Sequence, residues 1–240
     1  MTWPAASKIE KRSLSLQWVS FRRRLQRWLV PAWLGSLRSI KPRSEGWGFD
    51  RGRPVDRYYI DSFLEGQSKD IHGRVLEILN SDYTRRFGCC VEQADVLDIN
   101  PANRQATVIA DLAAADCIGA DSFDCFILTQ TLQLIYDVKS AIAHSYRILR
   151  PGGVVLVTIP AVSRLAGEGY TDYWRFTPAS CARLFGEIFG PEQVTITAYG
   201  NVLSAIAFLE GMACEELSKR ELDVIDESYP VLLAIRAVKK

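Results

Sequence analysis

The chain is poor in the residues that build metal sites and disulfide frameworks. It has two histidines and six cysteines among 240 residues, and no two cysteines are spaced as CxxC. We therefore expect no metal site, and we expect the cysteines to be buried free thiols. Long apolar runs are also lacking: none reaches the length of a membrane span, and the first residues lead into polar sequence rather than the apolar core of a signal peptide. These absences predict a cytoplasmic protein.

Charge is divided unevenly along an otherwise ordinary globular composition. Residues 1–45 hold ten Lys and Arg against two Glu, whereas residues 46–240 hold 19 basic and 26 acidic residues. The stretch 44–57 is rich in Gly, Pro and charge, as linkers often are. We therefore divide the chain into a basic N-terminal extension, residues 1–45, and one domain of catalytic size, residues 46–240.

The N-terminal extension carries an amphipathic pattern over residues 14–30. Its apolar residues recur at helical spacing, its arginines occupy the remaining arc, and Pro31 is expected to end the helix. The apolar set is Leu14, Trp18, Phe21, Leu25, Trp28 and Leu29. One interpretation is a helix docked on the domain with a solvated basic face; another is contact with an anionic membrane, here the inner membrane surface. No nucleic-acid motif accompanies the pattern, so we expect no nucleic-acid partner.

From residue 73 onward, short apolar runs alternate with helical segments. This alternation predicts an α/β fold with a doubly wound, mostly parallel, seven-stranded sheet. The expected strands are 74–78, one within 90–99, 107–110, 123–129, 154–159, 194–199 and 231–238. The expected helices are 58–64, 83–87, 138–149, 178–189 and 202–220.

Acidic residues stand at the ends of three successive predicted strands. They are Glu77, then Asp95 or Asp98, then Asp111. Ligands of open α/β sheets bind outside the carboxyl ends of the strands, so these carboxylates should border the site. A ribose diol and an exocyclic amine are hydrogen-bond donors that such carboxylates can accept. The row therefore favours a nucleoside-bearing ligand, but the absence of GxGxxG after the first strand disfavours a nucleotide-dependent dehydrogenase.

Four stretches carry a resemblance to a known family. RVLEILNS, VIADL, SFDCFILTQTLQLIYDV and RILRPGGVVLVTIP resemble the motifs of class I S-adenosylmethionine-dependent methyltransferases. The resemblance covers about residues 50–240. It implies a Rossmann-like methyltransferase fold, S-adenosyl-L-methionine as cofactor and S-adenosyl-L-homocysteine as product.

The resemblance also assigns cofactor-binding residues by position. It implies that Glu77 organises the first loop and meets the methionine amine, and that Asp95, preferred to Asp98, binds the ribose. Asp111 would face adenine. The further residues implied are Leu79, Asn80 and Ser81 in the loop, Leu112 beside Asp111, Gln130 after the fourth strand, and Arg57, Tyr58 and Tyr83 closing over the methionine end.

The first cofactor loop departs from the family pattern. Leu79 and Ser81 stand where the family usually has glycine, which permits positive φ and close approach of backbone to ligand. Two readings remain open: a loop that follows another path and still binds the cofactor, or a noncatalytic or regulatory protein that keeps the fold.

The acceptor side is expected in the loop after the fifth strand. This loop offers Asp172 as a general base, Arg175 to position a polar or anionic substrate, and Tyr173 as an aromatic neighbour. The stretches DRGxPVDRYYI, YTRRFG, DYWRFT and AYGNVLxAIAFL are similar to a bacterial subgroup often found beside glycosyltransferase and polysaccharide genes. This similarity implies an O-methyltransferase acting on a glycan, glycolipid or secondary metabolite, and it implies no oligomeric state.

Overall fold

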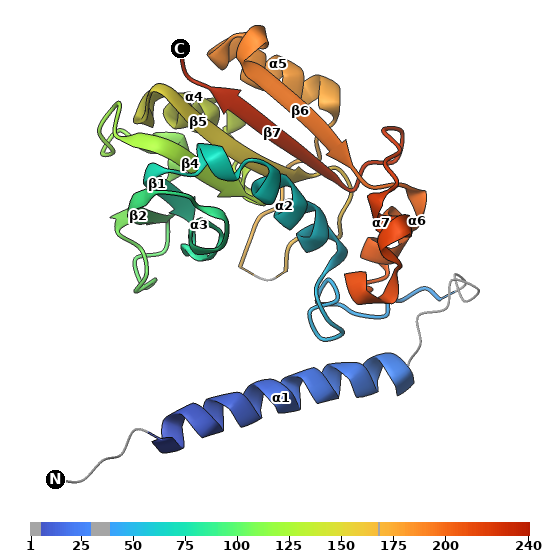
Figure 1. Cartoon of the computed structure of the whole chain (residues 1–240). Coiled ribbons are helices and arrows are strands. Elements are labelled where there is room, and N and C mark those ends of the chain that lie inside the picture. Colours follow the sequence, from blue (N-terminus) through green and yellow to red (C-terminus); the bar gives the residue numbers. More distant parts are fainter. Residues whose placement is uncertain (1–5, 30–38, 168) are drawn as a thin grey trace, which may run out of the picture.

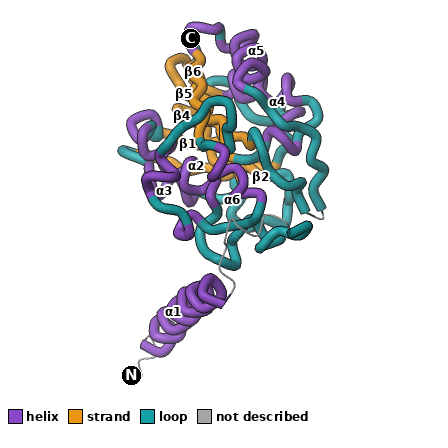
Figure 2. The backbone as a smooth tube through the Cα atoms, turned by 90° about the vertical axis from the view of Figure 1, so that its right-hand side faces the viewer, coloured by secondary structure: helices purple, strands orange, loops and turns teal. Residues whose placement is uncertain are grey.

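A computed structural model describes residues 6–29, 39–167 and 169–240, with side chains from residue 18 onward. The first element is helix α1 (Ala6–Leu29), which begins earlier than the predicted residue 14. The predicted helix end at Pro31 lies outside the described residues. In Figures 1 and 2, most of α1 lies apart from the domain, which it touches near its C-terminal end through Gln26 and Arg27. No described helix has the length and apolar character needed to cross a membrane.

The rest of the chain folds around one seven-stranded sheet, which confirms the predicted fold class. The strand order is β3-β2-β1-β4-β5-β7-β6, with β7 antiparallel to both of its neighbours. The strands are β1 (Gly73–Ile78), β2 (Val91–Asp98), β3 (Val108–Ile109), β4 (Phe123–Thr129), β5 (Leu149–Pro160), β6 (Val194–Tyr199) and β7 (Leu232–Val238). β5 begins five residues before its predicted start, because Leu149 already pairs with Phe123.

Helices cover both faces of the sheet (Figures 1 and 2). The α-helices of the domain are α2 (Val55–Gly66), α3 (Asp82–Phe87), α4 (Val138–Ile148), α5 (Pro178–Phe189), α6 (Val202–Leu209) and α7 (Lys219–Asp223). Short 3₁₀ helices are η2 (Ser68–Asp70), η3 (Leu112–Ala114), η4 (Leu132–Leu134), η5 (Pro191–Gln193) and η6 (Cys214–Glu216). One apolar core lies between the sheet and α4 and α5, and a second lies beneath α2 and α6.

The order in which strands are added to the sheet reverses between β1 and β4. β1 pairs with β2 on one side and with β4 on the other, all in parallel, so successive strands are added outward from this pair. The carboxyl ends of β1, β2 and β4 therefore share one edge, where loops on the two sides diverge and leave room for a ligand. We call this the carboxyl edge.

The predicted helix over 202–220 is wrong. The structure breaks it into α6, η6 and α7, since Gly211 turns the chain at φ +69°. A Cβ at Gly211 would collide with the backbone of Ser44, so the turn requires glycine. The redirected chain then pairs with the segment before α2, where the amide of Cys214 donates to the Arg53 carbonyl at 2.7 Å.

The cysteine prediction is confirmed only in part. All six cysteines are free, and Cys125, Cys181 and Cys214 are buried. The remaining three, Cys89, Cys90 and Cys117, are exposed in turns.

Candidate active site

Glu77 joins the carboxyl edge to the first turn of α3. Its carboxylate is 1% exposed and accepts hydrogen bonds from the Tyr83 amide (3.0 Å), the Thr84 amide (2.7 Å) and the Thr84 hydroxyl (2.7 Å). Burial raises the pKa of Glu77 above its ordinary value, although these hydrogen bonds oppose the rise. The carboxylate thus holds the loop between β1 and α3, which is the organising part of its predicted role.

The loop at residues 79–82 keeps a glycine-like path without glycine. Leu79 has φ +72°, in the left-handed region, whereas Ser81 has φ −110° and needs no glycine. The Asn103 side-chain amide donates to the Leu79 carbonyl at 2.7 Å and to the Asp98 carboxylate at 2.7 Å. Asn80 completes the loop by accepting from the Asp82 amide. Neighbouring groups therefore hold a backbone conformation that leucine alone disfavours.

Asp98, and not Asp95, stands at the carboxyl end of β2. Asp98 is the last residue of the strand, and its two oxygens accept from the Asn100 amide (2.9 Å) and from Asn103. A carboxylate has about four acceptor positions, so both oxygens can still accept from a ribose diol. Asn103 was not among the predicted residues, because nothing in the polar run NPANRQ distinguishes it.

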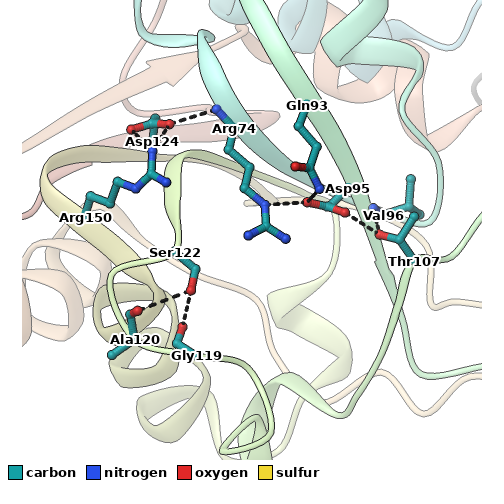
Figure 3. Close-up of polar contacts among 10 residues, drawn as sticks. All are labelled: Arg74, Gln93, Asp95, Val96, Thr107, Gly119, Ala120, Ser122, Asp124 and Arg150. Atoms are coloured by element: carbon teal, nitrogen blue, oxygen red, sulfur yellow. Dashed lines mark hydrogen bonds and ion pairs between the residues drawn. The ribbon is translucent and has the colours of Figure 1, made fainter.

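The preference for Asp95 is corrected by the register of the strands. Asp95 pairs with Leu76 in mid-strand, away from the edge. Its carboxylate is occupied by Arg74 (2.7 Å), Gln93 (2.9 Å) and Thr107 (2.9 Å), as Figure 3 shows. Burial favours a higher pKa, but these hydrogen bonds outweigh it and the pKa of Asp95 lies below its ordinary value. Asp95 is thus an internal link between β1, β2 and the chain entering β3.

Asp111 follows β3 at the same edge. Its side chain is exposed and accepts from the Ala113 amide at 2.9 Å, which caps η3. Leu112 is different: it is buried in the core beside α4 and cannot present its side chain to a ligand. The predicted position of Leu112 beside the adenine therefore stays a prediction, and it would rest on the backbone of Leu112.

Unpartnered polar atoms gather where β4 and β5 end. Gln130 has φ +49° and follows β4, with its amide donating to the Thr158 carbonyl at 2.7 Å. Within the described part of the chain, Gln130 Nε2, Gln133 Oε1 and Thr158 Oγ1 are buried and have no hydrogen-bond partner. Such groups cost free energy unless a ligand or water meets them. Gln133 was missed from the sequence, although it lies three residues after Gln130.

At the start of α2, a buried carboxylate oxygen without a hydrogen-bond partner lies next to an arginine. Asp56 is buried, its Oδ1 has no partner among the described residues, and burial raises its pKa. Arg57 donates to the Tyr83 hydroxyl at 3.4 Å, and no ion pair of the described residues includes it. The structure thus joins two of the three residues predicted at the methionine end, Arg57 and Tyr83. Asp56, although within the stretch DRGxPVDRYYI, was not predicted.

Tyr58 does not join them. Its hydroxyl donates to Asp223 of α7 at 2.5 Å, and the Arg53 guanidinium lies 5.7 Å from its ring centre. Burial and the hydrogen bond to Asp223 raise the pKa of Tyr58 to about 12. The predicted cofactor contact of Tyr58 is therefore replaced by a contact between α2 and α7.

The predicted base and its neighbour bind each other. The Asp172 carboxylate accepts from Arg175 Nη1 at 2.5 Å and Nη2 at 2.9 Å, and from the Ala166 amide at 3.0 Å. The pairing with Arg175 lowers the pKa of Asp172, which weakens it as a proton acceptor. Arg175 also donates to the carbonyls of Arg164 and Trp174, so it has little capacity left for a substrate. Both assignments are corrected: the pair braces the loop after β5.

Three aromatic side chains lie together beside this brace. Tyr173 and Trp174 pack against Tyr136, with ring centres 5.3 and 6.0 Å apart, and all three are exposed. Backbone amides of Tyr173 and Trp174 donate to the Gln133 carbonyl, which ties the cluster to the unpartnered polar atoms after β4. We call Tyr136, Tyr173 and Trp174 the aromatic shelf. The shelf borders a cavity of about 730 Å³, which also touches Phe176 and Leu184.

The segment containing these loops matches a known family model. Residues 72–157, from the approach to β1 through most of β5, match the model described as "Methyltransferase domain". Over this segment the chain is similar to a methyltransferase domain. The resemblance implied S-adenosylmethionine as the cofactor, and the match to this model agrees with it. A comparison with curated proteins gives no match.

Solved structures share the fold of the methyltransferase domain at low sequence identity. One is a SAM-dependent methyltransferase from Archaeoglobus fulgidus, with a TM-score of 0.52, 15% identity and coverage of 76% of this chain and 94% of that one. Another is a putative sarcosine dimethylglycine methyltransferase from Galdieria sulphuraria, with a TM-score of 0.51 and 13% identity. The match covers 78% of this chain and 90% of that one. The [4+2]-cyclase SpnF matches with a TM-score of 0.50 and 15% identity. The match covers 75% of this chain and 80% of that one.

The unpartnered groups at the carboxyl edge fit S-adenosylmethionine. Asp98 and Asp111 can accept from the ribose diol and the adenine amine, which both donate hydrogen bonds. The methionine end carries an ammonium and a carboxylate. These match Asp56, a buried acceptor without a donor, and Arg57, a half-buried cation without a described ion-pair partner.

The two aspartates of β2 give opposite predictions. Asp98→Ala should weaken binding of S-adenosylhomocysteine by roughly 10- to 100-fold, because charge-assisted hydrogen bonds contribute about 1.5–3 kcal/mol. Asp95→Ala should leave that affinity within about threefold but lower the free energy of unfolding by about 1–3 kcal/mol. Calorimetry and urea unfolding measure the two effects. Since the pKa of Asp95 is lowered on folding, the stability difference should shrink as pH falls below about 4. The reverse pattern would reinstate Asp95 at the ribose.

Leu79→Gly tests whether the loop is damaged or adapted. Glycine would remove the cost of holding leucine in the left-handed conformation, which is about 1–2 kcal/mol. It would also lose more conformational entropy on folding, which costs about 0.5–1 kcal/mol. We expect a small gain in the free energy of unfolding and a change in S-adenosylhomocysteine affinity below about threefold, since the backbone already follows the glycine-like path. A gain in affinity above tenfold would instead mean that the leucine side chain obstructs the site.

Proposed function

We propose that this methyltransferase transfers the methyl group to a hydroxyl oxygen of a glycan, glycolipid or secondary metabolite. The observation that carries the proposal is the aromatic shelf, which the Tyr173 and Trp174 amides tie to Gln133, a residue whose buried side-chain oxygen has no partner among the described residues. Apolar acceptors would not compensate those polar groups, whereas a polyhydroxylated acceptor offers both donors and acceptors. Aromatic faces next to polar groups suit the alternating C–H and O–H surface of such molecules.

The chain's own residues account for binding and positioning. Asp98 and Asp111 orient the nucleoside, Asp56 and Arg57 hold the amino-acid end, and Glu77 keeps the intervening loop in place. S-adenosylmethionine, when bound, supplies an electrophilic methyl carbon on sulfur. Gln130, Gln133 and Thr158 then hold the acceptor oxygen toward that carbon. Holding two reactants in attack geometry can by itself supply about 7–11 kcal/mol of rate acceleration.

No dedicated base is assigned to the reaction. Asp172 is a poor candidate, because its pairing with Arg175 lowers its pKa and so weakens it as a proton acceptor. A hydroxyl that is poorly acidic loses its proton late in the displacement, when the protonated ether oxygen is strongly acidic and water can accept the proton. Catalysis in this proposal rests on positioning of the acceptor against the methyl group.

A noncatalytic role is the competing proposal. It was motivated by Leu79 and Ser81, and the [4+2]-cyclase among the structural neighbours is a reminder that fold alone does not choose a reaction. The left-handed Leu79 and its support by Asn103 favour an adapted loop over a lost one.

Calorimetric titration with S-adenosylmethionine and S-adenosylhomocysteine separates the two proposals. We expect micromolar binding of both to the wild-type protein. Asp111→Ala should weaken it by roughly 10-fold or more, because the adenine amine loses a charged acceptor. Asp116→Ala, at an exposed position on the same connection, is the matched control and should bind normally. Absence of binding to folded wild-type protein would support the noncatalytic role.

Substitutions in the aromatic shelf test whether the acceptor is a glycan. The protein loaded with S-adenosylhomocysteine is applied to a glycan array, and glycans that retain it are then incubated with S-adenosylmethionine and analysed for a gained methyl group. Trp174→Ala should reduce retention by roughly 10-fold, as expected for the loss of about 1–2 kcal/mol of stacking. Tyr229→Ala, another exposed aromatic outside the shelf, should not. Retention that is equal in all variants, or no methylated glycan, would contradict a glycan acceptor.

A further inference from the structure

Helix α1 turns its apolar face away from the domain. The helix touches the domain through Gln26, which donates to Asp50 at 3.1 Å, and Arg27, which lies 3.8 Å from Glu215. Successive helical residues are offset by about 100°, so these two contacts define one side of α1. The apolar residues lie within an arc of about 100° on the opposite side. They are Trp18, Phe21, Leu25, Trp28 and Leu29, all exposed, with Trp18 at 70% and Trp28 at 77%.

Arginines line both borders of this apolar face. By the same helical spacing, Arg22 follows one border of the arc and Arg24 the other, while Arg23 lies with the domain-facing side. A helix with this arrangement can bury its apolar side at the acyl boundary while the flanking cations meet lipid phosphates. Tryptophan favours the same depth, because its ring is apolar and its N–H needs a polar partner.

Charge selects the occupant of this face. Residues 1–45 carry ten basic and two acidic residues, and within α1 the one acidic residue is Glu10. Two copies packing along this face would bring Arg22 and Arg24 of each helix together, which like-charge repulsion opposes. An anionic lipid surface has the complementary sign over the whole length of the helix.

We infer that α1 binds the surface of an anionic membrane through the face formed by Trp18, Phe21, Leu25, Trp28 and Leu29. The docked domain then has a defined orientation. The turn that holds Asp50 also contains Trp47, whose indole donates to Ser163 at 3.2 Å in the loop after β5. The helix is therefore anchored beside the carboxyl edge, and membrane binding brings the loop after β5 close to the lipid surface.

Full-length variants test the inference by vesicle sedimentation. Wild-type protein should bind vesicles of phosphatidylcholine and phosphatidylglycerol, and should bind pure phosphatidylcholine far less. Trp18→Ser with Trp28→Ser should weaken binding to the anionic vesicles by at least tenfold. Val19→Ser is the matched control, since Val19 is exposed on the same helix but outside the apolar face. It should bind as the wild type does.

Charge and self-association complete the test. Arg22→Glu with Arg24→Glu should weaken binding by roughly 25-fold or more, at about fivefold per cation removed, and added salt should weaken the wild type similarly. Equal sedimentation of wild type and both double variants would overturn the inference. So would a dimer that the tryptophan substitutions dissociate while vesicle binding is absent. Cofactor titration of the same variants should be unchanged, so a failed membrane test is distinguishable from a failed cofactor site.

Discussion

The carboxyl edge depends on one buried charge. Glu77 sits at the end of a central strand, where it satisfies two backbone amides and a hydroxyl at the start of α3. An apolar residue in its place would leave those buried amides unpaired and release the loop that follows. Three hydrogen bonds offset part of the desolvation of the carboxylate, and they hold the loop that the sheet presents to the ligand.

Two non-glycine residues in the left-handed region mark this edge. Leu79 follows β1 and Gln130 follows β4, and these strands are neighbours in the sheet. Each is held by a hydrogen bond from elsewhere: Asn103 donates to the Leu79 carbonyl, and Gln133 donates to the Gln130 carbonyl. Local strain retained by neighbouring groups is a common property of binding sites. Here it replaces the freedom that glycine would otherwise supply.

The sequence predicted the sheet well because strand patterns are local. Apolar runs ending in acidic or polar turns predicted all seven strands, with β4 and β6 at their observed bounds. Residues whose role depends on register or on distant partners were not predictable in the same way. Asp95 and Asp98 lie in one run, and only the pairing of Asp95 with Leu76 tells which of them reaches the edge.

Partner choice explains the remaining errors. Asp172 looked available because a sequence does not show that Arg175 folds back onto it. Tyr58, which the resemblance placed at the methionine end, donates instead to Asp223, a contact between distant segments that the sequence does not show. Asp56, Asn103 and Gln133 were missed for the converse reason, since each becomes informative only through what surrounds it in space.

The position of β7 has a consequence for synthesis of the chain. β7 lies between β5 and β6 and is antiparallel to both, yet it is made after them. Until it emerges from the ribosome, β5 presents an open edge and β6 has no partner in the sheet. Unpaired apolar strands of this kind invite pairing with other chains. The nascent protein therefore stays open to such pairing until its last strand joins the two parts of the sheet.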